Sequence, residues 1–195
     1  NDLFVGDFLA FVSEPRDILD LGTGTAQIPI ALCRACSGCR VLAVDAAASM
    51  LDVARYNVEL AGLIDRIQLA RADAKQLPYA TGYFSAVISN SIAHHLAEPG
   101  LALREGWRVT APGGSLFFRD LLRPATEAEC SQLVEQYTGH ESPRAQRLFA
   151  DSLRAALSLE EIQSLVVDLD VDASSVRRTS DRHWTWAAIK EDGGR

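Results

Sequence analysis

The chain has 195 residues, of which 48% are hydrophobic and 23% charged, a composition typical of one folded domain with a substantial core. Its formal net charge of −7 argues against a polyanionic partner, so we expect no nucleic-acid ligand unless a local basic patch overrides that charge. The sequence shows neither an apolar run of membrane-spanning length nor a charged-then-apolar leader, which predicts a cytoplasmic protein with no membrane contact.

The first 120 residues alternate between helix-like and strand-like segments with short connections. Apolar residues recur at helical spacing in four segments, namely 1–12, 25–36, 49–61 and 99–108. Short apolar runs predict five strands, at 18–21, 40–45, 66–70, 84–89 and 115–120. This alternation predicts an α/β fold in which helices cover both faces of a doubly wound, mostly parallel sheet.

The rhythm changes after residue 122. Residues 124–157 are helix-like with a break around Gly139 and Pro143, and Ser158 with Glu161 fits a capping box that starts another helix. Two strand-like segments, 174–180 and 183–190, predict a closing hairpin and therefore an antiparallel last strand. We expect a single domain over 1–195, with a helical lid at about 122–169 inserted between the fifth and sixth strands.

Polar residues stand where the predicted parallel strands end, which is the edge at which such sheets bind ligands. The first strand carries Asp20 and runs into Gly22 and Gly24, which allow a tight turn and a close approach of the backbone to a ligand. Asp45 ends the second strand, where a carboxylate can grip two ribose hydroxyls. Asp73 follows the third strand and can accept a hydrogen bond from an amino group such as that of adenine.

The glycine pair does not fit a nicotinamide dinucleotide well. The third glycine of that fingerprint would fall at Gln27, and a pyrophosphate would be repelled by a carboxylate as close as Asp20. A cationic group would be attracted by the same carboxylate. The pattern favours a nucleoside with a positively charged end, and the alternative is a strand-to-helix turn without a ligand.

Five ordered motifs resemble those of class I S-adenosylmethionine-dependent methyltransferases. They are "LDLGTGT", "VLAVDAAASML", "ARADAKQLPY", "FSAVISNSIAHHL" and "APGGSLFF". The resemblance is close over 18–120, and the closing "DRHWTWAAIK" is similar to the family's terminal antiparallel strand. It implies a seven-stranded Rossmann-like sheet, S-adenosyl-L-methionine as cofactor and S-adenosyl-L-homocysteine as product.

The resemblance also implies a set of cofactor-binding residues. The methionine moiety is expected at Asp20, Gly22, Thr23 and Gly24, and the ribose at Asp45. The adenine is expected at Asp73, Ala74, Ala46 and Met50, and the sulfonium near Asn90. Two of these have a plain structural alternative, because Asp73 can cap the turn that follows it and Met50 can belong to the core. The sequence departs from the family at Ala26, where a third glycine is common.

Methyl transfer from a sulfonium is an in-line displacement, and a base is needed only when the acceptor arrives protonated. His95, near the end of the fourth strand, is the candidate for this role, and the alternative is that it caps the next turn. A small-molecule acceptor is favoured because the chain offers no second domain to dock a macromolecule. A methyltransferase of RNA or protein and a binding module without turnover remain as alternatives.

Cys33, Cys36 and Cys39 form a C-x-x-C-x-x-C run that resembles metal-ligand spacing. The only further cysteine, Cys130, lies in an unrelated segment. Because free cysteine is often a small buried hydrophobe, we expect these residues to pack in the core and to bind no metal.

Overall fold

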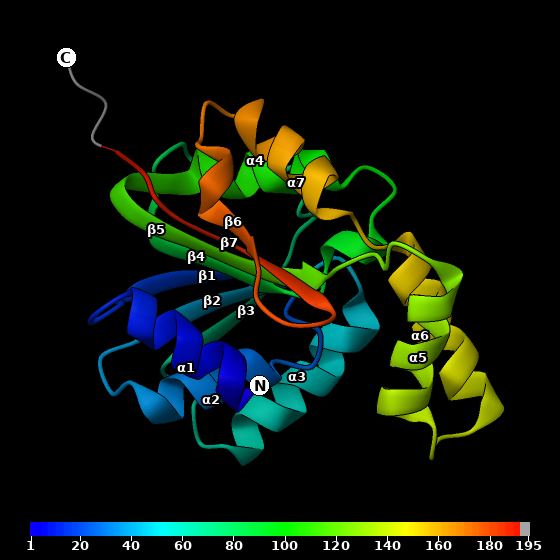
Figure 1. Cartoon of the computed structure of the whole chain (residues 1–195). Helices are drawn as coiled ribbons and strands as arrows, with labels where there is room; N and C mark the ends of the chain where they lie inside the picture. The colour runs from blue at the N-terminus through cyan, green and yellow to red at the C-terminus, as the bar shows by residue number, and fades with distance from the viewer. Residues whose placement is uncertain (192–195) are drawn as a thin grey trace. The chain divides into compact units, whose positions relative to one another are not determined.

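The computed structural model describes residues 1–191, and its strands form one seven-stranded sheet in the order β3-β2-β1-β4-β5-β7-β6 (Figure 1). In chain order the strands are β1 (Asp17–Leu21), β2 (Arg40–Asp45), β3 (Ile67–Arg71), β4 (Phe84–Asn90), β5 (Thr110–Leu121), β6 (Val176–Arg178) and β7 (His183–Ile189). β1 pairs in parallel with β2 and β4, β2 pairs in parallel with β3, and β6 with β7 is antiparallel. The predicted fold class is confirmed.

Seven α-helices and two short 3₁₀ turns connect these strands within the described residues. The helices are α1 (Asp2–Phe11), α2 (Gln27–Ala35), α3 (Ala48–Leu60), α4 (Pro99–Val109), α5 (Glu127–Thr138), α6 (Pro143–Ala155) and α7 (Leu159–Val167). The turns are η1 (Ala93–His95) and η2 (Ala173–Ser175). No helix in residues 1–191 combines the length and the apolar character needed to cross a bilayer.

The chain forms two compact units. The first comprises Asn1–Asn90, Gly100–Phe118 and the end of β7 from Ala187. In this unit α1, α2 and α3 lie on one side of β1–β4 and α4 on the other (Figure 1). Its core is apolar and aromatic, with the Phe4 and Phe8 rings packed on that of Phe117 at centroid distances of 5.3 and 5.8 Å. This burial fixes the strand ends that carry the candidate site.

The second unit comprises Ser91–Pro99 and Arg119–Trp186 and contains the helical insert. Side-chain caps start its helices: Thr126 for α5, Ser142 followed by Pro143 for α6, and the predicted capping box of Ser158 and Glu161 for α7. Its buried core comprises Leu121, Cys130, Leu133, Leu153 and Ala156. The role of this insert as a lid stays a prediction.

Three local expectations need correction. η1 was not predicted, because three residues are too few to show a period. β5 begins at Thr110 and therefore includes the "APGG" segment, where Gly113 takes a φ of 71°. The connection of the closing hairpin is four residues, 179–182, rather than a two-residue turn.

Candidate functional site

The loop between β1 and α2 has three residues in the left-handed region of backbone space. The φ angles are 71° at Gly22, 54° at Gly24 and 61° at Ala26. Glycine takes this conformation without a steric penalty, which explains the two glycines. Ala26 occupies the position where the resemblance leads one to expect a third glycine, and its methyl group makes the same conformation strained.

Backbone amides of this loop are tied to the end of β2. The amides of Gly22 and Thr23 donate to the Val44 carbonyl at 2.9 and 3.0 Å, and that of Gly24 donates to Asp45 Oδ2 at 2.9 Å. A Cβ built at Gly24 would meet no heavy atom of the described residues within 4 Å, its two chain neighbours aside. The loop is thus held from one side, while the space next to Gly24 is open to a ligand.

Asp20, at the end of β1, is buried without a full set of partners. The residue is 2% exposed, and its Oδ2 accepts no hydrogen bond from the described residues. Burial raises the pKa of Asp20 to about 7; the nearby Thr23 hydroxyl lowers it and the charge of Asp45 raises it. Thr23 Oγ1 is likewise buried; it lies near enough to Asp20 to lower the pKa of that carboxyl, but it makes no hydrogen bond of normal geometry within the described residues. Two unpartnered oxygens at one strand end are costly unless a ligand supplies donors.

This donor set fits the cofactor implied by the resemblance. A buried carboxylate of raised pKa is stabilised by an ammonium group, and the amino group of a methionine moiety is one. The open space at Gly24 gives the backbone room for that moiety. The Asp20 and Thr23 oxygens are the structural observation that favours a cationic nucleoside over a dinucleotide.

Asp45 already accepts two hydrogen bonds. Its Oδ2 takes the Gly24 amide, and its Oδ1 takes the Ala47 amide at 2.8 Å. Each carboxylate oxygen has a second lone-pair direction, so the group can still accept from two ribose hydroxyls. The ribose role of Asp45 stays a prediction, and the structure adds a second role, which is to hold the glycine loop.

The other predicted contacts lie at the ends of β2, β3 and β4. Asp73 is exposed, and its Oδ1 accepts a hydrogen bond from the Lys75 amide at 2.9 Å. Its Oδ2 lies 3.5 Å from Lys75 Nζ. Asp73 therefore caps the turn that follows it, which is the structural alternative given for this residue. Met50 is 45% exposed, which removes the core alternative for this residue. Ala46 is exposed, and Asn90, at the end of β4, is half-buried.

Ala74 is buried beside the Asp73 turn, and its contact with adenine stays a prediction, as do those of Asp73, Ala46, Met50 and Asn90.

The two histidines after β4 take different roles. His94 Nδ1 lies 2.5 Å from Asp120 Oδ1, and both side chains are buried, at 6% and 3% exposure. The His95 ring packs against that of His94, with the ring centroids 3.9 Å apart and the planes tilted by 43°. Partial desolvation lowers the pKa of His95 and His94 lowers it further, whereas Asp120 raises it. His95 is therefore neutral near pH 7 and able to accept a proton.

Sequence reasoning missed Asp120. It stands at the end of the fifth strand in "FFRD", the same kind of position that singled out Asp20 and Asp45, so the signal was present. Its second oxygen accepts the Ala93 amide at 2.5 Å, and the Leu121 amide donates to the first at 2.7 Å. These bonds fix the carboxylate that orients His94.

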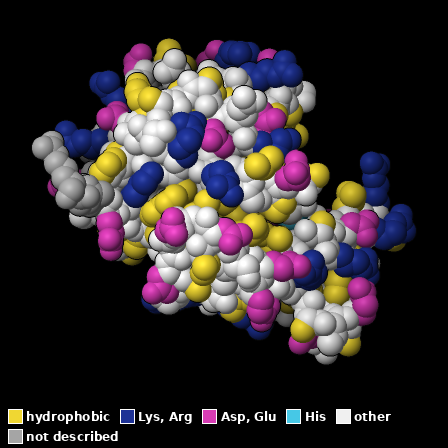
Figure 2. Space-filling view, turned by 90° about the horizontal axis from the view of Figure 1, so that it is seen from above, with side chains coloured by type: hydrophobic (Ala, Val, Ile, Leu, Met, Phe, Trp, Pro, Cys, Tyr) yellow, Lys and Arg dark blue, Asp and Glu magenta, His cyan; other side chains and the backbone are white. Residues whose placement is uncertain are grey.

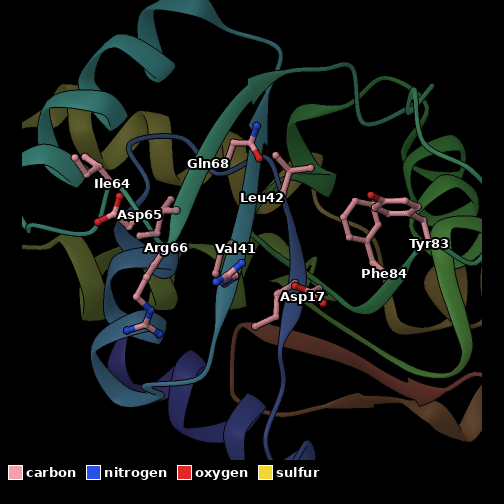
Figure 3. A pocket seen from close by; sticks show the side chains of 12 residues that line it. Asp17, Val41, Leu42, Ile64, Asp65, Arg66, Gln68, Tyr83 and Phe84 are labelled. Carbon is pink, nitrogen blue, oxygen red and sulfur yellow. The ribbon is translucent and has the colours of Figure 1, made fainter.

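A cavity of about 710 Å³ opens at the opposite edge of the first unit, where the strands begin. Asp17, Val41 and Phe84 line it, together with Arg66 and Tyr83 (Figure 3). None of its lining residues is among the predicted cofactor contacts. Parallel sheets bind their ligands at the carboxyl ends of the strands, so this cavity is not assigned to the cofactor.

The cysteine run is only partly a packing element. Cys33 and Cys39 are buried in the core, as expected, whereas Cys36 is half-buried and forms a disulfide with Cys39. Cys130 is buried in the second unit. No three His, Cys, Asp or Glu side chains of residues 1–191 gather as metal ligands. The expectation that the cysteine run binds no metal stays a prediction.

Comparison with known proteins decides the family. A model described as "Methyltransferase domain" matches residues 19–118, which is half of the chain and contains the glycine loop and the ends of β1 to β4. The chain belongs to this methyltransferase domain family. It is a class I S-adenosylmethionine-dependent methyltransferase, and its cofactor is S-adenosyl-L-methionine.

Two named relatives and one solved structure extend this result. A ubiquinone/menaquinone biosynthesis C-methyltransferase (UbiE) of Pectobacterium atrosepticum is 28% identical over 173 residues, covering 83% of this chain and 68% of that protein. A demethylmenaquinone methyltransferase of Thermus thermophilus is 39% identical over 108 residues, 55% of this chain and 48% of that protein.

The fold is shared with a structure titled as a putative S-adenosyl-L-methionine-dependent methyltransferase of Methanococcus maripaludis. The TM-score is 0.74 at 18% identity, over 99% of this chain and 86% of that one. At this identity the likeness concerns the fold alone. Within the methyltransferase family, the Asp20 and Thr23 oxygens and the open loop at Gly24 are the features of this chain that suit the cofactor.

Proposed function

We propose that this methyltransferase methylates a small aromatic acceptor of the quinol type, at carbon. The support is the extent of the similarity to the UbiE protein. That similarity covers 83% of the chain, so it continues beyond residues 19–118, the part that the family model matches. The remaining residues include the insert, where an acceptor is selected in our interpretation. The printed names of both relatives refer to quinones, and one specifies a C-methyltransferase.

The residues of the first unit would bind and orient the cofactor. Asp20 would accept from its ammonium group, Thr23 would add a hydroxyl, and the backbone at Gly24 would lie against the methionine moiety. When bound, S-adenosyl-L-methionine supplies an electrophilic methyl group on a sulfonium. The leaving group is a neutral thioether, so the chain contributes alignment and exclusion of water rather than stabilisation of a charged leaving group.

His95 would act on the acceptor. A quinol carbon becomes a good nucleophile when an adjacent ring hydroxyl loses its proton, and a neutral imidazole can take that proton. After the methyl group is transferred, the same ring carbon loses its hydrogen as a proton, which restores the aromatic ring. The lowered pKa of His95 keeps it in the neutral form. The Asp120 carboxylate holds His94, and the His94 ring packs against His95 and restricts its orientation. In this proposal His95 is the base, and His94 and Asp120 are positioning residues.

Activity on a reduced naphthoquinone that lacks its ring methyl group tests the proposal. The chain is incubated with this quinol and isotope-labelled S-adenosyl-L-methionine, and the product is identified by mass spectrometry. We expect label on a ring carbon and one S-adenosyl-L-homocysteine per methyl group. His95→Gln is expected to lower kcat by about 10²-fold with little change in cofactor affinity. Label on oxygen, or none on the quinol, would reject the proposed acceptor.

The alternative of an RNA or protein acceptor has weaker support. The basic cluster of Arg177, Arg178 and Arg182 is engaged locally: Arg178 donates to the Ser180 carbonyl at 3.0 Å, and the Arg182 guanidinium lies 3.3 Å from the centroid of the Tyr137 ring. On the face shown in Figure 2, basic and acidic side chains are interspersed. Transfer of label to an RNA or protein fraction with a steep salt dependence would favour this alternative.

A further inference from the structure

The end of α2 carries a cysteine pair that methyl transfer does not use. Cys36 directly follows the helix, and Cys39 directly precedes β2; their Cα atoms are 5.6 Å apart and their sulfurs are bonded. The loop closed by this bond spans a sequence separation of three residues, so it constrains the unfolded chain far less than a bond between distant segments. A role beyond stability is therefore worth seeking.

The two sulfurs differ in accessibility. Cys39 is 0% exposed, whereas Cys36 is half-buried and is followed by the exposed Ser37 and Gly38. An incoming thiolate must reach the sulfur that it attacks from the side opposite the bond that breaks. Cys36 Sγ is therefore the open position, and Cys39 is the leaving group on reduction and the attacking group on reoxidation.

The surroundings suit the Cys39 sulfur in its released form. Its Sγ lies 3.2 Å from the Pro15 carbonyl oxygen, to which a Cys39 thiol can donate. Two nitrogens of the Arg66 guanidinium donate to the Cys39 carbonyl, Nε at 3.0 Å and an Nη at 2.7 Å. These bonds fix the backbone of Cys39, and with it the position of the sulfur beside the Pro15 carbonyl.

Arg66 also fixes the turn itself. Its guanidinium donates to the carbonyls of Cys33, at 2.7 Å, and of Cys36, so three carbonyls from the end of α2 and the turn converge on one cation. In Figure 3 the Arg66 side chain extends away from the Tyr83 and Phe84 rings that line the cavity at that edge. The positive charge compensates the negative end of the helix dipole and holds Cys36 and Cys39 close whether or not their sulfurs are bonded.

We propose that Cys36 and Cys39 form a thiol–disulfide exchange site for low-molecular-weight thiols and disulfides. In the oxidising direction the Cys36 thiolate attacks one sulfur of a small disulfide RSSR, the S–S bond of RSSR breaks, and one RSH leaves after protonation. The Cys39 thiol then attacks Cys36 Sγ, and its proton passes to the departing RS⁻, which leaves as the second RSH. Two electrons pass from the dithiol to RSSR, and reduction by RSH is the reverse.

Cys33 is the competing partner, and the sequence offers a direct way to distinguish it. Trypsin cuts after Arg34 and after Arg40, which places Cys36 and Cys39 together on the peptide "ACSGCR" and Cys33 on the preceding one. A bond between Cys36 and Cys39 stays inside one peptide. A bond to Cys33 links two peptides and gives a different mass.

The experiment uses the full chain, reduced with dithiothreitol, freed of it, and then treated with oxidised glutathione. We expect the two cysteines of "ACSGCR" to become oxidised and no longer react with an alkylating reagent, while Cys33 and Cys130 are still alkylated. In Cys39→Ser the glutathione adduct should accumulate on Cys36, and in Cys36→Ser an adduct on Cys39 should form at least about tenfold more slowly. Cys130→Ser serves as the matched control and should oxidise like the unmodified chain.

Unfolding in guanidinium chloride should make the rates of adduct formation on Cys36 and Cys39 equal, because the difference between these rates arises from burial. A bond to Cys33, equal adduct rates on Cys36 and Cys39 in the folded variants, or persistence of both thiols would overturn the proposal. Peptide mapping of the unmodified chain requires no substitution, so it decides between Cys33 and Cys39 even where a variant does not fold.

Discussion

Asp20 and Asp120 are two buried aspartates near strand ends, each 2% exposed, and they differ in their partners. Asp120 accepts from two backbone amides and from His94, whereas Asp20 Oδ2 accepts from no group of the described residues. The Asp120 carboxylate has its donors within the protein, whereas Asp20 has an oxygen left for a donor that a ligand could supply. Burial alone thus does not distinguish these two carboxylates, but the number of donors that each receives does.

The largest effect is expected for Asp20→Asn. Loss of the carboxylate leaves a bound ammonium group buried without its counter-charge, so affinity for S-adenosyl-L-methionine should fall by about 3–5 kcal/mol. Calorimetry measures it. Asp17→Asn, at the exposed start of the same strand, is the matched control and should bind normally. Equal affinity of the two variants would show that Asp20 does not hold the ammonium group.

The same substitution should stabilise the ligand-free protein. The pKa of Asp20 rises on folding from 3.8 to about 7, so its contribution to stability is present below about pH 4 and is lost as the pH rises through about 7. At pH 8 the neutral amide avoids this penalty, and the free energy of unfolding should rise by up to about 4 kcal/mol. Denaturant unfolding at pH 4 and pH 8 checks the sign.

Asp120→Ala should lower the stability of the protein and leave its affinity for the cofactor nearly unchanged, the reverse of Asp20→Asn. Its removal leaves the amides of Ala93 and Leu121 and the His94 ring without their acceptor, so the free energy of unfolding should fall by about 2–3 kcal/mol. Cofactor affinity should change little in the fraction that remains folded. Asp151→Ala, which breaks the exposed ion pair with Arg154, is the control, with an effect below about 1 kcal/mol. An equally small effect for Asp120 would refute its structural role.

Asp45→Ala tests the intermediate case, a carboxylate that is partly satisfied and partly available. We expect cofactor affinity to fall by about 1–3 kcal/mol through loss of charge-assisted hydrogen bonds, while circular dichroism shows an intact fold. Asp73→Ala, at an exposed residue that caps its own turn, should have the smaller effect. The reverse order would assign the stronger cofactor contact to Asp73.

The pH dependence of binding sharpens the comparison further. The cofactor's ammonium group favours ionised Asp20, so affinity should rise with pH through about 7 and, below that, fall by up to about tenfold per pH unit. Calorimetry in buffers of different ionisation enthalpy should also detect proton release on binding below pH 7. If the affinity of Asp20→Asn for the cofactor does not change with pH, the pH dependence of the unmodified chain is due to Asp20.

The smallest effect concerns the backbone beside Asp20. Ala26→Gly should stabilise the protein by about 0.5–1 kcal/mol, because relief of the left-handed strain exceeds the extra entropy of a glycine in the unfolded chain. Ala31→Gly, inside α2, is the control and should destabilise by about 1 kcal/mol. Denaturant unfolding distinguishes the two signs.

The sequence by itself determined features that depend on neighbouring residues. Alternating apolar periods predicted the order of strands and helices, and Ser158 with Glu161 predicted the start of α7. Glycines after an apolar run predicted the loop at Gly22, because that backbone conformation excludes most side chains. Motif order then indicated the cofactor, which the family assignment confirms.

Only the tertiary structure decided which distant groups meet. Asp120 and His94 are 26 residues apart, and Arg66 reaches Cys33 over 33 residues, so no local period encodes either contact. The three cysteines are chemically equal in the sequence, and they become different because packing buries Cys39 and leaves Cys36 accessible. Asp20 likewise differs from Asp120 only in the donors that folding brings to it. Partners, burial and hence pKa are properties of the packed chain, which is why the sequence could propose these residues but not assign their roles.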